Sequence, residues 1–176
     1  MKKYGMVIGI ILTFSLVNFA FAKETTKIGY IDFQRALTTS EAGKDAKAII
    51  AKQYEKDQKI LSEKQEELKK LKEELEKQGL LMKEDVRKEK ERGYQTKFRD
   101  FQIYFKGAQE NLKEEELKLT KPIIEELEKI AAEIGEKKGF TLILMKSLGI
   151  IYTNKSIDLT DETIEAYNNK YATEKK

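Results

Sequence analysis

The sequence has no cysteine and no histidine. Without cysteine, the chain can form no disulfide, no thiolate metal site and no thiol nucleophile. Without histidine, it lacks the commonest general base and the commonest metal ligand in proteins. No glycine-rich loop of the P-loop type occurs, so no nucleotide-binding site is expected. These absences predict a protein that is not an enzyme and that uses neither a cofactor nor a metal ion.

The sequence also has little proline and little net charge. The 176 residues include a single proline, while 37% are charged, which favours long helices surrounded by water. Lysine and arginine number 34 against 31 aspartate and glutamate residues, and two of the lysines lie in the first three residues. The rest of the chain is therefore close to neutral. Because proteins that bind nucleic acids usually have a marked basic excess, we expect no nucleic-acid partner.

The long hydrophobic run lies at the N-terminus. Lys2 and Lys3 precede an apolar stretch over residues 6–17, and the small-x-small sequence Ala20-Phe21-Ala22 follows it. This pattern predicts a secretory signal peptide over residues 1–22, cleaved after Ala22. An uncleaved membrane anchor is the alternative, since the run approaches spanning length, but its glycine and polar residues argue against that role. We therefore expect an exported protein.

Residues 46–121 have the pattern of one long helical hairpin. In the first arm apolar side chains recur every seven residues, at Tyr54, Leu61, Leu68, Leu75 and Met82. In the second arm spacings of three and four alternate along Tyr94, Phe98, Phe101, Phe105, Ala108, Leu112 and Leu119. Gly79 separates the two arms. Two facing seams predict an antiparallel coiled coil, although Asp57 and Lys64 interrupt the first seam.

The flanking regions, residues 23–45 and 122–176, are expected to form one small body. Residues 27–33 are β-branched and aromatic, which is typical of a strand. Residues 140–145 have the pattern of a buried strand, and residues 150–153 that of its hairpin partner. The predicted fold is therefore mainly α with a small β body, in which a long antiparallel coiled-coil hairpin stands on a β-sheet base.

A body of this size with open strand edges is marginally stable by itself. Assembly of several copies through the sheet would cover those edges. The residues expected at the interface between copies belong to the predicted strands and are Ile28, Ile31, Leu142, Leu144, Ile151 and Tyr152.

A series of short segments extends over essentially the whole chain after residue 22. It comprises Ile-Gly-Tyr-Ile-Asp at 28–32, Ala-Leu at 36–37, Ser-Glu-Ala-Gly-Lys at 40–44, the charged hairpin, Pro-Ile at 122–123, Gly-Phe at 139–140, Ile-Ile-Tyr at 150–152 and Ile-Asp-Leu-Thr at 157–160. In their order and spacing these segments resemble the Skp/OmpH family of periplasmic chaperones for outer-membrane proteins. The resemblance implies a homotrimer, in which a small β-rich body carries three helical tentacles around a cavity. It also implies ATP-independent holding of unfolded β-barrel proteins, called clients below.

The client-binding candidates are apolar residues of the hairpin. They are Leu80, Leu81 and Met82 at the turn and Tyr94, Phe98, Phe101, Tyr104 and Phe105 in the second arm. For Phe98, Phe101 and Phe105, packing inside the seam is the competing interpretation. Tyr104 lies off the strict seam spacing, which favours client contact. For the three turn residues, closure of the hairpin is an equal alternative.

Members of the family are often distinctly basic, whereas this chain is near neutral after residue 22. Residues 83–99 contain seven basic and four acidic side chains, which indicates either a mildly basic tip or an ordinary solvated face. We expect only weak contact with anionic lipid or lipopolysaccharide. The sequence thus predicts a periplasmic holdase, a chaperone that binds unfolded proteins and prevents their aggregation. The alternative is a structural coiled-coil adaptor of the cell envelope.

Overall fold

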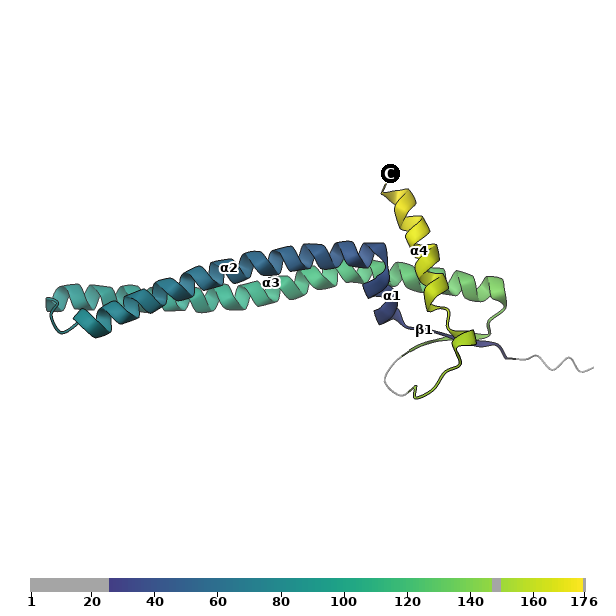
Figure 1. The fold of residues 1–176 in the computed structure, drawn as a ribbon, viewed down its shortest axis with the longest axis horizontal. Helices are drawn as coiled ribbons and strands as arrows, with labels where there is room; N and C mark the ends of the chain where they lie inside the picture. The colour runs from purple at the N-terminus through teal and green to yellow at the C-terminus, as the bar shows by residue number, and fades with distance from the viewer. Residues whose placement is uncertain (1–25, 147–149, 176) are drawn as a thin grey trace, which may run out of the picture.

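The computed structural model describes residues 26–146 and 150–175, which form a long helical hairpin attached to a small body (Figure 1). The elements in chain order are β1 (Ile28–Ile31), α1 (Phe33–Thr39), α2 (Glu41–Gln78), α3 (Glu84–Lys138), β2 (Leu142–Met145), the short 3₁₀ helix η1 (Lys155–Ile157) and α4 (Thr160–Glu174). The predicted signal peptide lies outside the described residues. Within them, no helix combines the length and the hydrophobicity that a membrane crossing requires.

The hairpin consists of α2 and the first part of α3. Ser40 starts α2 as its N-cap, because its side-chain oxygen accepts a hydrogen bond from the backbone N–H of Gly43. The helix ends at Gln78, directly before Gly79. α3 then returns along α2 and continues through Pro122 into the body (Figure 1). It ends at Lys138, and the C-cap residue Gly139 has a φ of 67°, in the left-handed region that glycine adopts without steric cost.

The sheet has two strands, and they are parallel. β1 pairs with β2 in a register that runs from Ile28 opposite Leu142 to Ile31 opposite Met145. Parallel neighbours need a long crossover connection, and here the whole helical hairpin provides it. The predicted antiparallel partner of β2 is wrong, because residues 150–153 form no strand and extend away from the sheet in a loop (Figure 1).

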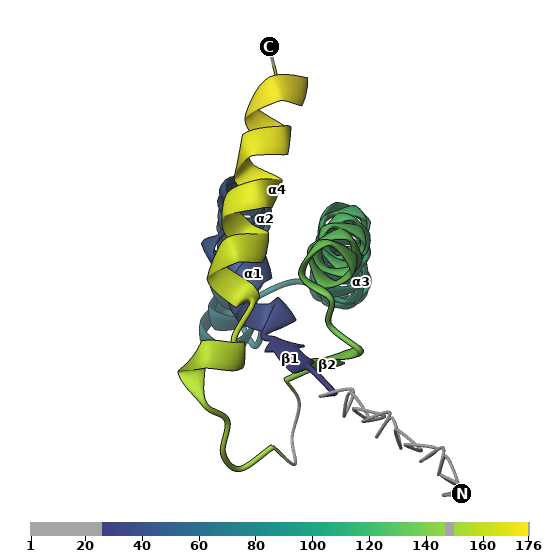
Figure 2. The ribbon, with the colours of Figure 1, turned by 90° about the vertical axis from the view of Figure 1, so that its right-hand side faces the viewer.

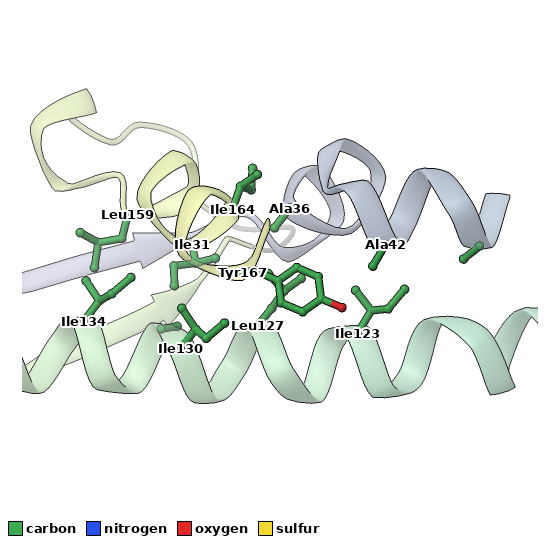
Figure 3. Packing of buried hydrophobic residues seen from close by; sticks show 12 residues of the cluster. Ile31, Ala36, Ala42, Ile123, Leu127, Ile130, Ile134, Leu159, Ile164 and Tyr167 are labelled. Atoms are coloured by element: carbon green, nitrogen blue, oxygen red, sulfur yellow. The ribbon is translucent and has the colours of Figure 1, made fainter. Parts of the chain in front are cut away.

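The core lies where α3, α4, α1 and the sheet meet (Figure 3). From α3, one apolar face contributes Ile123, Leu127, Ile130 and Ile134. Ile31 from β1 and Tyr167 from α4 pack on the same cluster. Gly29 permits the close approach of the strand to its neighbours, because a Cβ atom at this position would lie 2.9 Å from both Leu159 Cδ1 and the Phe140 ring.

α4 fixes the base of the hairpin by crossing it at a steep angle (Figure 2). The Tyr171 hydroxyl donates a hydrogen bond of 2.9 Å to Asp45 on α2, and Lys175 Nζ lies 2.6 Å from the same carboxylate. On α3, Glu126 forms ion pairs with Lys170 of α4 and with its neighbour Lys129. The orientation of the hairpin relative to the body therefore depends on polar contacts as well as on the core.

Candidate functional site

The interface between the two arms is more polar than the heptad pattern predicts. Leu61 and Leu68 are buried as expected, and so is Asp57, which is only 8% exposed. Tyr54, which the seven-residue spacing places in the seam, is instead half exposed. A straight helix has 3.6 residues per turn, so a strict seven-residue repeat drifts around it. Asp57 lies four residues before Leu61, in the companion seam position of the repeat, and it is the residue that enters the interface there.

A hydrogen bond between the arms explains the buried carboxylate. The Tyr104 hydroxyl donates to Asp57 Oδ1 at 2.7 Å, and Gln53 Nε2 donates to Asp57 Oδ2 at 2.9 Å. The ammonium group of Lys64 lies 5.6 Å from the centre of the Tyr104 ring. The hydrogen bond to Asp57 raises the pKa of Tyr104 above its usual value of 10.0. The expectation that Tyr104 lies off the interface is therefore wrong.

A signal for this contact was present in the sequence. Asp57 and Tyr104 each depart from the apolar pattern of their own arm, and they lie at similar distances from the turn at Gly79. In an antiparallel hairpin, residues at similar distances from the turn face each other. The polar residues that break the two apolar patterns, Asp57 and Tyr104, therefore predict the contact when the two arms are aligned about the turn. The pattern of a single arm does not predict it.

The aromatic residues of α3 divide into a packed group and an exposed group. Tyr94 and Phe101 are half-buried, and each stacks on the next aromatic one helical turn further along. The ring centres lie 6.2 Å apart for Tyr94 and Phe98, and 6.3 Å apart for Phe101 and Phe105. Phe98 and Phe105 remain 42% and 43% exposed. Each stacked pair therefore presents one phenylalanine to solvent and supports it with the other ring.

Phe98, Phe105 and Tyr54 lie along one side of the hairpin, here called the aromatic flank. One groove between the arms is lined by both Lys47 of α2 and Glu116 of α3. These two residues therefore lie on the same side of the hairpin. Tyr54 follows Lys47 by seven residues, and Phe105 precedes Glu116 by eleven, spacings that keep residues on one face of a helix. Tyr54 of the first arm therefore lies on the same side of the hairpin as Phe98 and Phe105 of the second arm.

The hairpin turn exposes leucine, and the charges around it are paired. Leu80 and Leu81 are 94% and 89% exposed, whereas Met82 is half-buried. The ion pairs near the turn are Lys77–Glu73, Lys88–Glu84, Arg87–Glu91 and Lys90–Glu74. These four basic side chains have acidic partners, which favours the interpretation as an ordinary solvated face over that of a basic patch.

The residues expected at the interface between copies are mostly exposed in the single chain. Ile28, Leu142 and Leu144 are partly exposed on the sheet, and the loop after β2 leaves Ile151 completely exposed, with Tyr152 close to it in exposure. Ile31 corrects the expectation, because it is fully buried in the core of its own chain. Its side chain points to the face of the sheet that α3 and α4 cover.

Comparison with known proteins matches this fold and the order of its elements. The family model described as "Outer membrane protein (OmpH-like)" matches residues 27–167, from β1 into α4. The chain belongs to this family. A Skp-like protein of Pseudomonas aeruginosa is 24% identical over 168 residues, which cover 96% of this chain and 98% of the relative.

A solved structure from Caulobacter crescentus CB15 has the same fold. It is described as an OmpH-like protein proposed to be an outer membrane chaperone, and it superposes on this OmpH-like chain with a TM-score of 0.71. The superposition covers 83% of this chain and 86% of the other at 16% sequence identity. The family membership and the mainly helical fold on a small sheet are thus shown together.

Proposed function

We propose that this OmpH-like chain is an ATP-independent periplasmic holdase, which binds unfolded outer-membrane proteins and prevents their aggregation before membrane insertion. The aromatic flank is the observation that carries the proposal. A helical rod standing in water normally keeps its large apolar side chains in the seam. Here Tyr54, Phe98 and Phe105 have large exposed surfaces along one side. The family relationship supports a chaperone role, since the OmpH-like Caulobacter protein is described as a proposed outer membrane chaperone.

The chemistry of the flank suits an unfolded client. A β-barrel precursor exposes alternating apolar residues and unpaired strands, which aggregate with other copies. Full burial of one large apolar side chain contributes at most about 1.5–3 kcal/mol. Each contact with the flank is therefore weak, and several contacts on several hairpins are needed for useful avidity. Weak, distributed contacts also allow release without a nucleotide, provided that membrane insertion is favourable.

Among the aromatic residues of α3 expected to bind clients, Phe98 and Phe105 are the exposed ones. Tyr94 and Phe101 support them by stacking, and Tyr104 fixes the two arms through Asp57. We assign these three residues a supporting role. Leu80, Leu81 and Met82 lie at the end of the hairpin and form a separate surface.

The proposed assembly is a homotrimer held together by the body. The resemblance to the family implies three copies. The sheet offers an edge through which the copies can pair. β2 pairs with β1 on one side, and the loop after it exposes Ile151 completely. Such a loop next to an open strand edge suits strand addition between copies. Ile28, Leu142, Leu144 and Tyr152 would then be covered together with Ile151.

We further propose export to the periplasm through the signal peptide over residues 1–22, and action without a cofactor, without catalysis and without nucleic acid. A structural envelope adaptor remains the second candidate function. A holdase binds many unfolded proteins through general apolar contacts, whereas an adaptor binds one folded partner through a specific surface. Promiscuity towards unfolded proteins therefore distinguishes the two.

The test is suppression of aggregation of an outer-membrane protein diluted from urea. The double variant Phe98→Gln/Phe105→Gln removes both exposed rings and keeps good helix formers. Ile103→Gln/Leu117→Gln is the matched control, since both residues are exposed and Ile103 is two residues, or about 200°, from Phe105 of the flank. We expect the first variant to lose most of its activity and the control to retain it. Equal suppression by both variants, or equal binding of a folded soluble protein, would reject the flank as the client surface.

A further inference from the structure

A groove lies at the base of the hairpin, where α2 and α3 meet α4. It has a volume of about 400 Å³, and residues of all three helices line it, among them Ala42, Asp45, Ile49, Leu119, Glu126 and Tyr167. This junction groove shares Ile49 with a second groove of about 670 Å³, which continues between the two arms. Asp45 is two residues, or about 200°, from Lys47 of α2. The junction groove and the aromatic flank therefore lie on different sides of the hairpin.

Tyr167 of α4 provides an unpaired hydroxyl at the wall of the junction groove. The residue is only 6% exposed, yet its hydroxyl has no hydrogen-bond partner among residues 26–146 and 150–175. In this part of the chain no fully enclosed side-chain oxygen lacks a partner, so the hydroxyl opens on the groove. Figure 3 shows it pointing toward Ile123, which also lines the groove. Since buried hydroxyls are normally paired, this one is available to a ligand.

The charges that line the junction groove are all negative. Asp45, Glu126 and Glu174 line it, one from each helix, and no lysine or arginine of the described chain does. Burial and the neighbouring Tyr171 raise the pKa of Tyr167 above its usual value of 10.0. The negative charges of Glu126 and Glu174 raise it further, so both carboxylates act on this hydroxyl. The groove therefore favours a cation beside Tyr167.

The lysines that pair with these carboxylates lie outside the groove. Lys175 contacts Asp45, and both Lys129 and Lys170 contact Glu126. The side chains of the three lysines are between 48% and 69% exposed. Ion pairs with this exposure contribute little to stability, so an incoming ammonium group can replace a lysine at small cost.

A lysine side chain on an extended polypeptide fits these features. Its ammonium group donates three hydrogen bonds, and the Tyr167 hydroxyl and the carboxylates of three helices are the acceptors. Its methylene groups can cover Leu119 and Ile123 in the groove. In the second groove, the side-chain amides of Gln53 and Asn111 can pair with the free N–H and C=O groups of an extended backbone. A free amine would leave these amides unused.

We propose that the junction groove binds a lysine side chain of an unfolded client, while the second groove holds the extended backbone beside it. Lys52 and Lys56 line the second groove, so the preference for a cation is confined to the junction. The inference rests on the proposed holdase function for the source of the segment. It adds a second client surface, which selects by charge, whereas the aromatic flank selects by apolar contact.

Two fluorescent peptides test the inference on the mature protein, residues 23–176. They share one sequence of alternating apolar and polar residues and differ at a central position, which is lysine in one and norleucine in the other. Norleucine retains the aliphatic chain and removes the ammonium group. Fluorescence anisotropy measures both dissociation constants, and we expect the lysine peptide to bind about five- to tenfold more tightly.

Tyr167→Phe removes the hydroxyl and retains the ring. Because the hydroxyl has no partner in the described residues, the thermal midpoint should not fall, whereas the preference for the lysine peptide should decrease about threefold or more. Glu174→Gln should also reduce this preference. Its matched control is Glu165→Gln, which removes the same charge from an exposed position of α4 outside the groove and should leave the preference unchanged.

Four outcomes would overturn the inference. They are equal binding of the two peptides, an unchanged preference in Tyr167→Phe, equal effects of Glu174→Gln and Glu165→Gln, and competition by the diamine cadaverine as strong as that by the lysine peptide.

The source of the segment has its own test. An unfolded outer-membrane protein should displace the lysine peptide, and equal displacement by a folded soluble protein would reject a client as the source. The lysine preference should persist in Phe98→Gln/Phe105→Gln, which lacks the exposed rings of the aromatic flank. A negative result in the aggregation assay would leave the peptide measurements unaffected, so the two proposals can fail separately.

Discussion

The phenol oxygen of Tyr104 lies 2.7 Å from Asp57 Oδ1, and this hydrogen bond joins the two arms of the hairpin at a carboxylate that is 8% exposed. A buried polar pair in a coiled coil fixes the register of its helices, because slipping by one turn leaves the charge unpaired. Since Tyr104 also lies next to the Phe101 and Phe105 stack, the same register places the aromatic flank.

Removing the Tyr104 hydroxyl should destabilise the hairpin. Tyr104→Phe leaves one donor fewer for a buried carboxylate, which costs roughly 1–3 kcal/mol of unfolding free energy. Urea unfolding monitored by circular dichroism measures the loss. Asp57→Leu/Tyr104→Phe is the control, because replacing both partners with apolar groups should recover stability. A double variant no more stable than Tyr104→Phe would contradict a pairing role for this contact.

Acid should weaken the body through Asp158 and Asp32. Burial raises the pKa of Asp158, but hydrogen bonds from Thr160 and the nearby Arg35 outweigh it and keep the pKa below the usual 3.8. The backbone N–H of Arg35, aided by Lys146, lowers the pKa of Asp32 despite partial burial. A folded pKa below the unfolded value gives stability that is present above pH 3.8 and lost as the pH falls through the lower folded value.

The measurement is the thermal midpoint between pH 7 and pH 2. The wild type should lose stability mainly below about pH 4, and Asp158→Asn should start lower at pH 7 and lose less in acid. Asp161, which is largely exposed although it contacts Arg35 at 2.6 Å, provides the comparison variant Asp161→Asn. An equal acid response in the wild type and Asp158→Asn would show that other groups dominate.

A charge on the exposed apolar loop should prevent assembly without unfolding the chain. Ile151 is fully exposed in the single chain, so Ile151→Lys disturbs no intramolecular packing. If copies meet through this loop, burying an unpaired ammonium group costs several kcal/mol, and light scattering should show the mass of one chain. Ile103→Lys on the hairpin should leave a trimer. A monomeric wild type would contradict the proposed assembly.

Export should remove the first 22 residues. Lys2, Lys3, the apolar run and Ala20-Phe21-Ala22 predict cleavage by a signal peptidase, and N-terminal sequencing of the exported protein should begin at Lys23. Replacing Ala22 with a bulky residue, as in Ala22→Phe, should block cleavage. Recovery of unprocessed wild-type protein in the membrane fraction would support the anchor interpretation.

The sequence by itself determined the elements that depend on local pattern. The apolar repeats and the paired charges of residues 46–121 indicated a helical hairpin, and Gly79 marked its turn. Both strands of the sheet were also predictable, because β1 combines isoleucine with tyrosine and β2 is a short continuous apolar run. The ordered set of short segments pointed to the family.

Only the tertiary structure decided how these elements meet. The parallel pairing of β1 with β2 joins segments separated by the whole hairpin, and residues 150–153 form no strand although their composition suits one. The angular position of Tyr104, facing Asp57, and of Phe98, facing solvent, depends on how two helices pack around each other. A repeat within one arm cannot specify that angle, because the seam drifts around each helix and only the opposite arm fixes which side chains it covers.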